Sequence, residues 1–163
     1  MGGETISIAM ITIASVICAA TFVTSAFPAI ARTQDPLIAS TDAINDRMKT
    51  DITIIHETDS SSGNIVYIWV KNVGNNRIPQ NMIANSDLFF GPEGDFMRLE
   101  YNASGSISPG WNYTLENGGD KWGQGETIKV TANTTADPVI SGTEYFVKLI
   151  MYNGISDEDY FTV

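Results

Sequence analysis

The stretch ISIAMITIASVICAATFVTSAFPAI, residues 6–30, decides the fold, because no charged residue interrupts the chain between Glu4 and Arg32. A helix rises about 1.5 Å per residue, so about 25 residues reach roughly 37 Å, enough to cross a hydrocarbon core of ~30 Å. The run is longer than the apolar part of a secretory signal, and no basic segment precedes it. We interpret it as one helix, embedded in a membrane or buried in a helix bundle.

Small and hydroxylated residues recur along this run, several of them four positions apart. Such residues allow two helix backbones to approach closely in a membrane. We therefore predict that the helix packs against other helices, in a complex or in a filament. The positions predicted to lie at these helix contacts are Ser15, Ala19, Ala20, Thr24, Ser25 and Ala29.

Two further residues of the N-terminal segment have more than one interpretation. Glu4 stands at the start of the predicted helix, where the helix dipole favours a carboxylate. The alternative for Glu4 is the role of an acidic pilin residue, which pairs with the amino terminus of a neighbouring subunit. Cys18 is the one cysteine of the chain, so it forms no intramolecular disulfide, and we interpret it as a small hydrophobic side chain in a packed helix.

The apolar run continues into a more polar segment. Pro28 removes a helix hydrogen bond and should kink the helix near its end. From residue 37 to residue 49 the pattern becomes amphipathic, with Leu37, Ile44 and Met48 on one stripe. We therefore predict two domains: residues 1–49, a transmembrane or bundle helix with an amphipathic stalk, and residues 50–163, a separate β domain.

Strand patterns replace the helical pattern from residue 50 onward. Segments rich in β-branched and aromatic residues alternate with Gly, Pro, Asn and Ser every 8–15 residues or so, which favours an antiparallel sandwich or barrel. The strand 64–71 is apolar enough to be buried on both faces, and residues 79–86 favour a short helical turn. The predicted strands are 51–58, 64–71, 88–90, 96–101, 111–115, 127–131, 144–152 and 160–163, the last two joined at Asn153-Gly154.

Three sequons for N-glycosylation follow the helix, at Asn102, Asn112 and Asn133. They favour an extracytoplasmic location for the β domain. The formal net charge of −10 argues against nucleic acid or anionic lipid as its partner.

The basic residues beside the helix favour the opposite topology. Arg32, Arg47 and Lys49 all lie on its C-terminal side, which the positive-inside rule would keep in the cytoplasm. We give the sequons more weight, because large domains translocate largely regardless of flanking charge.

Catalytic and metal-binding patterns are sparse. His56 is the one histidine, no Gly-x-Ser-x-Gly motif accompanies it, and the glycines around Trp122 lack the lysine of a phosphate loop. The run Asp157-Glu158-Asp159 could bind Ca²⁺ with other oxygen donors, but an exposed acidic turn is the preferred interpretation, as it is for Glu93 and Asp95. We predict no enzyme activity, no cofactor and no metal site.

The aromatic residues of the β domain should mostly belong to its core. Trp111 and Trp122 stand beside predicted turns, so either could instead anchor a contact with another protein.

Several short sequence segments, taken in order, resemble those of the archaellum (archaeal flagellum) accessory proteins FlaG and FlaF, which are related to archaellins. The resemblance covers essentially the whole chain and is nearer to FlaG than to FlaF. The segments are Glu4-Thr5-Ile6-Ser7, Ile68-Trp69-Val70-Lys71-Asn72-Val73-Gly74, Arg77-Ile78-Pro79, Ser86-Asp87-Leu88-Phe89-Phe90-Gly91-Pro92, Trp122-x-Gln124-Gly125-Glu126-Thr127-Ile128 and Tyr152-Asn153-Gly154-Ile155-Ser156.

This resemblance implies an α+β protein, with a long N-terminal transmembrane helix followed by an all-β, immunoglobulin-like antiparallel sandwich outside the membrane. It implies a non-enzymatic stator or accessory component of the motility machinery, which contacts the filament, a FlaF-like partner or the S-layer and forms homo-oligomers through its helix or its sandwich. Precursors of archaellins and pilins carry a basic leader, whereas here only Met1-Gly2-Gly3 precedes Glu4, so either the leader is absent or the chain is already processed. This difference favours a protein retained in the membrane over a bulk filament subunit.

Two alternatives remain open. The chain could be an archaellin-like structural subunit, polymerised in a surface filament through its N-terminal helix. It could also be a membrane-anchored binding or enzymatic ectodomain, which a ligand or metal in the sandwich would favour.

Overall fold

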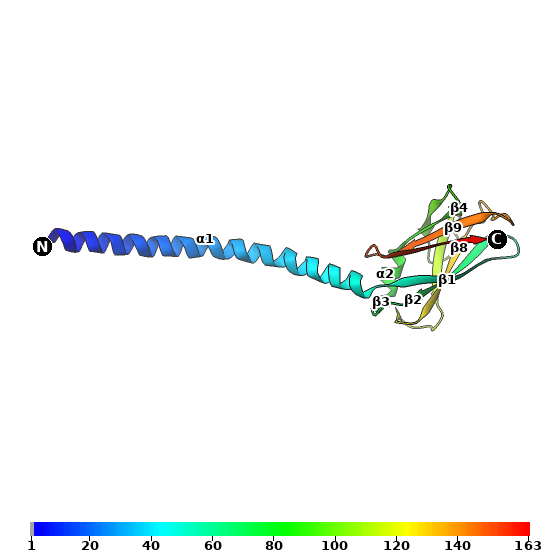
Figure 1. Ribbon diagram of the computed structural model, residues 1–163, viewed down its shortest axis with the longest axis horizontal. Helices are drawn as coiled ribbons and strands as arrows, with labels where there is room; N and C mark the ends of the chain where they lie inside the picture. Colours follow the sequence, from blue (N-terminus) through cyan, green and yellow to red (C-terminus); the bar gives the residue numbers. More distant parts are fainter. Residues whose placement is uncertain (1) are drawn as a thin grey trace. The chain divides into compact units, whose positions relative to one another are not determined.

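The computed structural model describes residues 2–163, except the side chains of residues 31 and 33–37. The chain divides into two compact units, Met1–Ile44 and Asn45–Val163. Helix α1 (Gly2–Lys49) continues through Pro28 as one uninterrupted element, and its last turn belongs to the second unit (Figure 1).

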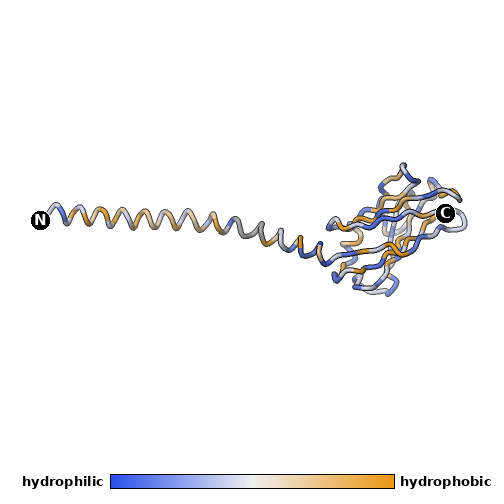
Figure 2. The backbone as a smooth tube through the Cα atoms, in the orientation of Figure 1, coloured by the Kyte–Doolittle hydropathy of each residue, from blue (hydrophilic) through white to orange (hydrophobic). Residues whose placement is uncertain are grey.

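The polarity of α1 changes along its length. Apolar positions dominate its N-terminal part and mix with polar positions toward Lys49 (Figure 2). On the predicted amphipathic stripe, Ile44 and Met48 are exposed, while the side chain of Leu37 lies outside the described residues.

The second unit is a β-sandwich that is nearly closed into a barrel. Eight strands form a single sheet in the order β1-β2-β8-β6-β5-β4-β9-β10, and β3 pairs with β7 beside it. The elements are β1 (Ile52–Asp59), β2 (Ile65–Asn72), β3 (Ile78–Pro79), α2 (Gln80–Ala84), β4 (Asp87–Pro92), β5 (Met97–Tyr101), β6 (Gly110–Leu115), β7 (Lys121–Trp122), β8 (Thr127–Asn133), β9 (Glu144–Ile150) and β10 (Ser156–Thr162).

The pairing is antiparallel except at one place. A short parallel pair, Glu100 with Gly110 and Tyr101 with Trp111, joins β5 to β6 and so connects the two layers of the sandwich. Strands β9 and β10 form the predicted hairpin around Asn153-Gly154, but β10 already begins at Ser156, so the prediction of an acidic turn at Asp157-Glu158-Asp159 was wrong and these residues pair with β9. The expected sandwich is therefore confirmed, with this parallel pair as an addition.

Alternation of apolar and polar residues builds the core. In β2 the side chains of Val66, Ile68 and Val70 are buried, as are Ile128, Val130 and Ala132 in β8. The prediction that β2 is buried on both faces was wrong, because its outward residues, such as Tyr67 and Trp69, are only half-buried. Tyr67 and Trp69 contact each other there, with ring centroids 6.1 Å apart.

Both tryptophans that stood beside predicted turns are core residues. Trp111 is 1% exposed and Trp122 is 0% exposed, so neither can anchor a contact with another protein. Trp122 is buried because the two-residue strand β7 pairs with β3, which the sequence pattern did not predict.

Candidate functional site

The apolar part of α1 is the first candidate surface. Gly2–Ile30, 29 residues, is long and apolar enough to cross a membrane by length and composition. Its large side chains are exposed, among them Phe22 at 71% and Phe27 at 72%, so the described part of this chain does not cover them. Contact of these apolar side chains with water costs free energy, so the helix is stable where a bilayer or other helices cover them.

The hydroxyl groups within the apolar part of α1, residues 2–30, donate hydrogen bonds to carbonyls of the helix itself. Ser15 Oγ donates to the carbonyl of Thr12 at 2.8 Å, Thr24 Oγ1 to that of Ala20 at 3.0 Å, and Ser25 Oγ to that of Phe22 at 3.1 Å. A hydroxyl bonded in this way is tolerated in hydrocarbon, where an unpaired one is costly.

The predicted helix contacts stay a prediction. Ser15, Ala19, Ala20, Thr24, Ser25 and Ala29 all lie on the exposed surface of α1. Glu4 is exposed in the first turn, where either interpretation of its carboxylate fits.

The C-terminal end of α1 is fastened to the sandwich through the backbone. The last carbonyls of a helix have no partners within the helix and need others. Here the carbonyl of Lys49 accepts hydrogen bonds from the backbone N–H groups of Asn75, at 2.8 Å, and Asn76, at 3.0 Å. A Cβ atom at Gly74 would lie 2.5 Å from the same carbonyl, so this approach requires glycine.

Side chains complete this attachment, which we call the helix socket: Asp46, Thr50, Asn76, Tyr152 and Asn153. Asp46 accepts through both carboxylate oxygens, from Asn76 Nδ2 at 2.6 Å and from the Tyr152 hydroxyl at 2.7 Å. Thr50 is 3% exposed, and its hydroxyl accepts from Asn153 Nδ2 at 2.9 Å and donates to the carbonyl of Asp46 at 2.8 Å. The last turn of α1 is therefore held from two segments that are far away in the chain.

The electrostatics of the socket favour a neutral Tyr152. Partial burial raises its pKa, and the hydrogen bond to Asp46 and the charge of Asp46 raise it further. A tyrosine whose pKa is higher in the folded state contributes stability that is lost as pH rises above its ordinary value near 10. The free energy of unfolding should therefore decrease in strongly alkaline solution.

Several of the sequence segments that carry the resemblance to FlaG and FlaF meet at the helix socket. Asn72 Nδ2 donates to the carbonyls of Asn76, at 2.8 Å, and Trp122, at 3.1 Å. Glu126 accepts from the backbone N–H of Gly123 at 2.7 Å, and the carbonyl of Glu126 accepts from Trp122 Nε1 at 2.8 Å. The Asn72 loop, the Trp122–Glu126 loop and the Tyr152–Asn153 turn thus form one hydrogen-bonded end of the sandwich.

Replacing Asp46 should destabilise the sandwich. The variant Asp46→Ala removes the acceptor of the Tyr152 hydroxyl and the shortest hydrogen bond of Asn76 Nδ2, and leaving such a part-buried donor without its partner costs about 1–3 kcal/mol. We expect the midpoint of thermal unfolding, followed by circular dichroism of the full chain in detergent, to fall by several degrees.

The matched control is Asp42→Ala, one turn earlier on α1, where the side chain is exposed. Asp42→Ala should leave the midpoint unchanged. Equal midpoints for the two variants would contradict a stabilising role of Asp46.

The open side of the sandwich carries inward-facing carboxylates. Strands β1 and β10 are the two ends of the sheet, and Asp157 Oδ2 accepts from the backbone N–H of Ile54 at 2.7 Å. This contact lies at a β-bulge, where the register with β2 shifts between Ile54 and His56. Inward-pointing charges at a sheet edge oppose pairing with another strand.

Glu57 belongs to the same edge. One of its carboxylate oxygens is buried without a hydrogen-bond partner among the described residues. Burial, and then the charges of Asp159 and Asp157, raise the pKa of Glu57 from 4.5 to about 6. The ionised form is therefore disfavoured in the folded protein.

Replacing Glu57 should stabilise the protein at neutral pH. Between pH 4.5 and about 6 the folded state binds more protons than the unfolded state, so the free energy of unfolding decreases as pH rises through this window. Above about pH 6 the full destabilisation by the ionised Glu57 is present. A shift of roughly 1.5 units corresponds to about 2 kcal/mol, and solvent screening reduces this to about 1 kcal/mol, because the side chain is only half-buried.

The variant Glu57→Gln should therefore melt a few degrees higher than the parent at pH 7, and the difference should disappear at pH 4. Glu93→Gln is the control, since Glu93 is exposed on another turn. A gain at pH 4 equal to that at pH 7 would rule out charge as the cause.

The described residues bring no metal-binding cluster together. Within residues 2–163, apart from the side chains not described, no group of three His, Cys, Asp or Glu residues could hold a metal ion. His56 is exposed and contacts the ring of Trp69, with centroids 5.3 Å apart, while Asp157 is engaged by Ile54. Cys18 is exposed on α1.

The three sequons surround one loop. Asn133 Nδ2 donates to the carbonyl of Gly105 at 3.1 Å, the carbonyl of Asn102 accepts from the N–H of Gly105 at 2.9 Å, and a Cβ atom at Gly105 would approach Asn112 Nδ2. Asn112 lies within β6, whereas Asn102 and Asn133 lie at strand ends. Glycosylation of these residues stays a prediction.

Comparison with known proteins identifies the family. The model of the archaeal-type flagellin family matches residues 2–161. The chain belongs to the archaeal-type flagellin family. An uncharacterised protein of Archaeoglobus fulgidus is 31% identical over 166 residues, which is 99% of each chain.

Similar solved structures agree with this family assignment. The archaellum periplasmic stator protein FlaG from Sulfolobus acidocaldarius has 28% identity and a TM-score of 0.59 over 69% of this chain and 99% of its own. A chain of the FlaF–FlaG stator complex from the same organism has 26% identity and a TM-score of 0.58 over 68% of this chain and 87% of its own. The archaeal flagellum of Methanospirillum hungatei shares the fold, with 15% identity and a TM-score of 0.71 over 97% of this chain and 92% of its own.

The predicted resemblance to FlaG and its relatives is confirmed by these matches. Sequence reasoning missed the helix socket. The sequence feature that pointed to the socket was the pair of Asn-containing turns at Asn75-Asn76 and Tyr152-Asn153, which lie in or beside the segments that resemble FlaG and FlaF.

Proposed function

We propose that this chain of the archaeal-type flagellin family is a membrane-anchored stator or accessory component of the archaellum. The helix spans the membrane, the sandwich lies outside the cytoplasm, and the sandwich contacts a FlaF-like partner, the filament or the S-layer. The proposal includes no enzyme activity.

The helix socket carries this proposal. A stator must transmit force between an anchor and the surface that it touches, so the end of its helix has to be firmly attached to the sandwich. In this chain the last turn of α1 is bonded to the sandwich by the Lys49 carbonyl and by the carboxylate of Asp46. The similarity to the stator protein FlaG, which covers 99% of FlaG, supports the same role.

The second candidate is a filament subunit. The match to the Methanospirillum hungatei flagellum covers 97% of the chain, the helix included, and the exposed small residues of α1 suit a helix bundle. The lower identity of that match, 15% against 28% for FlaG, favours the stator role.

Mass spectrometry of sheared, washed archaella beside the membranes they leave behind tests the choice. We expect the chain to remain with the membrane and cell wall and to be present only in traces in the filaments. A content in the filaments equal to that of the major subunit would contradict the stator role and make the chain a filament subunit.

A further inference from the structure

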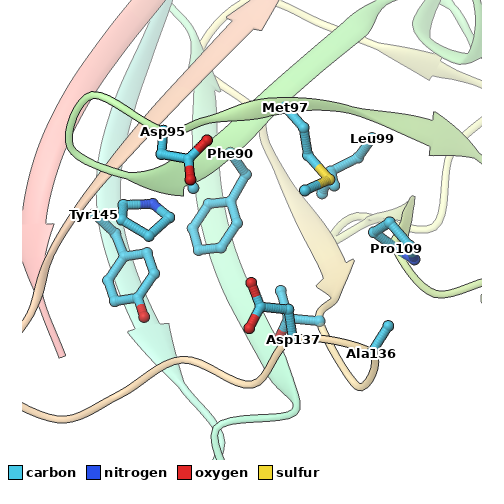
Figure 3. Close-up of a pocket in the computed structure, with 11 residues that line it drawn as sticks. Phe90, Asp95, Met97, Leu99, Pro109, Ala136, Asp137 and Tyr145 are labelled. Carbon is cyan, nitrogen blue, oxygen red and sulfur yellow. The ribbon is translucent and has the colours of Figure 1, made fainter.

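A small pocket opens at the end of the sandwich remote from the helix socket. Strand β4 begins at Asp87, opposite Ile150 and near Tyr152, and ends at Pro92, opposite Tyr145. Six residues of strand cover roughly 17–20 Å. The pocket lies beyond this far end, between the β4–β5 turn and the β8–β9 loop (Figure 3).

The wall of the pocket is apolar and its rim is acidic. Phe90 and Leu99 form the buried wall, with exposed fractions of 4% and 2%, and the side chain of Met97 is 50% exposed beside them. Asp95, from the β4–β5 turn, and Asp137, from the β8–β9 loop, lie on either side of Phe90 in the view of Figure 3. Both aspartates are exposed.

The pocket is held open by the fold. The ring of Phe90 stacks on that of Tyr145, with centroids 5.4 Å apart and planes within 3°. In the β8–β9 loop, the N–H of Ala136 donates to Ser108 Oγ at 2.9 Å, and the N–H of Asp137 to the carbonyl of Thr134 at 2.9 Å. A Cβ atom at Gly91 would lie 2.5 Å from the carbonyl of Asp95, so glycine is required for this turn.

The size of the pocket restricts its occupant. Its volume is about 190 Å³, whereas sites for small molecules and cofactors occupy roughly 300–1,000 Å³. A volume of this size suits a single side chain. An apolar wall with two carboxylates at the rim matches a side chain with a long apolar stem and a cationic head, as in lysine and arginine.

No salt bridge among the described residues involves the two carboxylates of the rim, so both can bind a cation of a partner. The two salt bridges among the described residues are Arg98–Asp87 and Lys148–Glu158, so neither Asp95 nor Asp137 is paired there. With a net charge of −10, the chain favours a basic partner in general. Asp95 and Asp137 add a defined position for the positive charge.

We propose that this pocket binds a lysine or arginine side chain from an exposed loop of a partner protein. The apolar stem would pack on Phe90, Met97 and Leu99, and the cation would lie between Asp95 and Asp137. The inference rests on the proposed function, which it deepens by naming the chemistry through which the sandwich holds its partner. Force on the pocket would pass along β4 and β9 to the socket.

Titration of the isotope-labelled full chain in detergent micelles, followed by NMR, tests the binding chemistry. The probes are Nα-acetyl-lysine amide and Nα-acetyl-norleucine amide, which have equal apolar stems and differ in the charge. We expect the lysine probe to cause saturable shifts at the amides of Leu99, Thr134 and Ala136, and the norleucine probe to bind at least tenfold more weakly.

Variants of the rim give the control. In the double variant Asp95→Asn/Asp137→Asn the affinity for the lysine probe should fall to that for norleucine, while Asp120→Asn, an exposed aspartate on another loop, should change nothing. The proposal is overturned if the lysine probe gives no saturable shift at the pocket, or if the two probes bind equally.

Swimming assays of a gene deletion and of the double variant distinguish failure of the pocket's role from failure of the proposed function. If deletion of the gene leaves swimming intact, the proposed function fails. If deletion abolishes swimming while the Asp95→Asn/Asp137→Asn cells swim like the parent, the proposed function stands and the role of the pocket is overturned. Loss of swimming in the double variant, with unchanged levels of the protein, supports the pocket.

Discussion

The carboxylate of Asp46 is the contact on which the rest of the architecture depends. It lies on the last turn of α1 and accepts hydrogen bonds from Asn76, in the loop before β3, and from Tyr152, 106 residues further along the chain. Without it, the last turn of α1 would be attached to the sandwich by its backbone contacts and by the hydroxyl of Thr50. A charged acceptor shared by two distant segments holds the last turn of α1 firmly against the sandwich.

The same domain avoids unwanted association at its open side. Strands β1 and β10 end the sheet, yet Asp157 binds the backbone of β1, and Glu57 is held close to Asp157 and Asp159. The raised pKa of Glu57 shows that this arrangement costs stability at neutral pH. The cost is understandable because an open strand edge invites pairing with other chains.

Much of the fold followed from the sequence because hydrophobic periodicity is a local signal. The uncharged run before Arg32 predicted the helix, and alternation in segments such as 127–131 predicted the strands. The pair of β3 with β7 was missed because strands of two residues carry no periodicity, and the burial of Trp122 depends on that pair. Asp46 was missed for a different reason: in the sequence it resembles Asp42, and only its distant partners distinguish the two.

Amide hydrogen exchange of the full chain in detergent tests the central claim, that the end of α1 and the sandwich form one rigid body. The backbone N–H groups of Thr50, Asn75 and Asn76 report the joint, and that of Val130 in β8 reports the core. We expect the amides of the joint to exchange nearly as slowly as that of Val130, because the joint opens only when the sandwich unfolds. Exchange at the joint that is orders of magnitude faster, while Val130 stays protected, would contradict it.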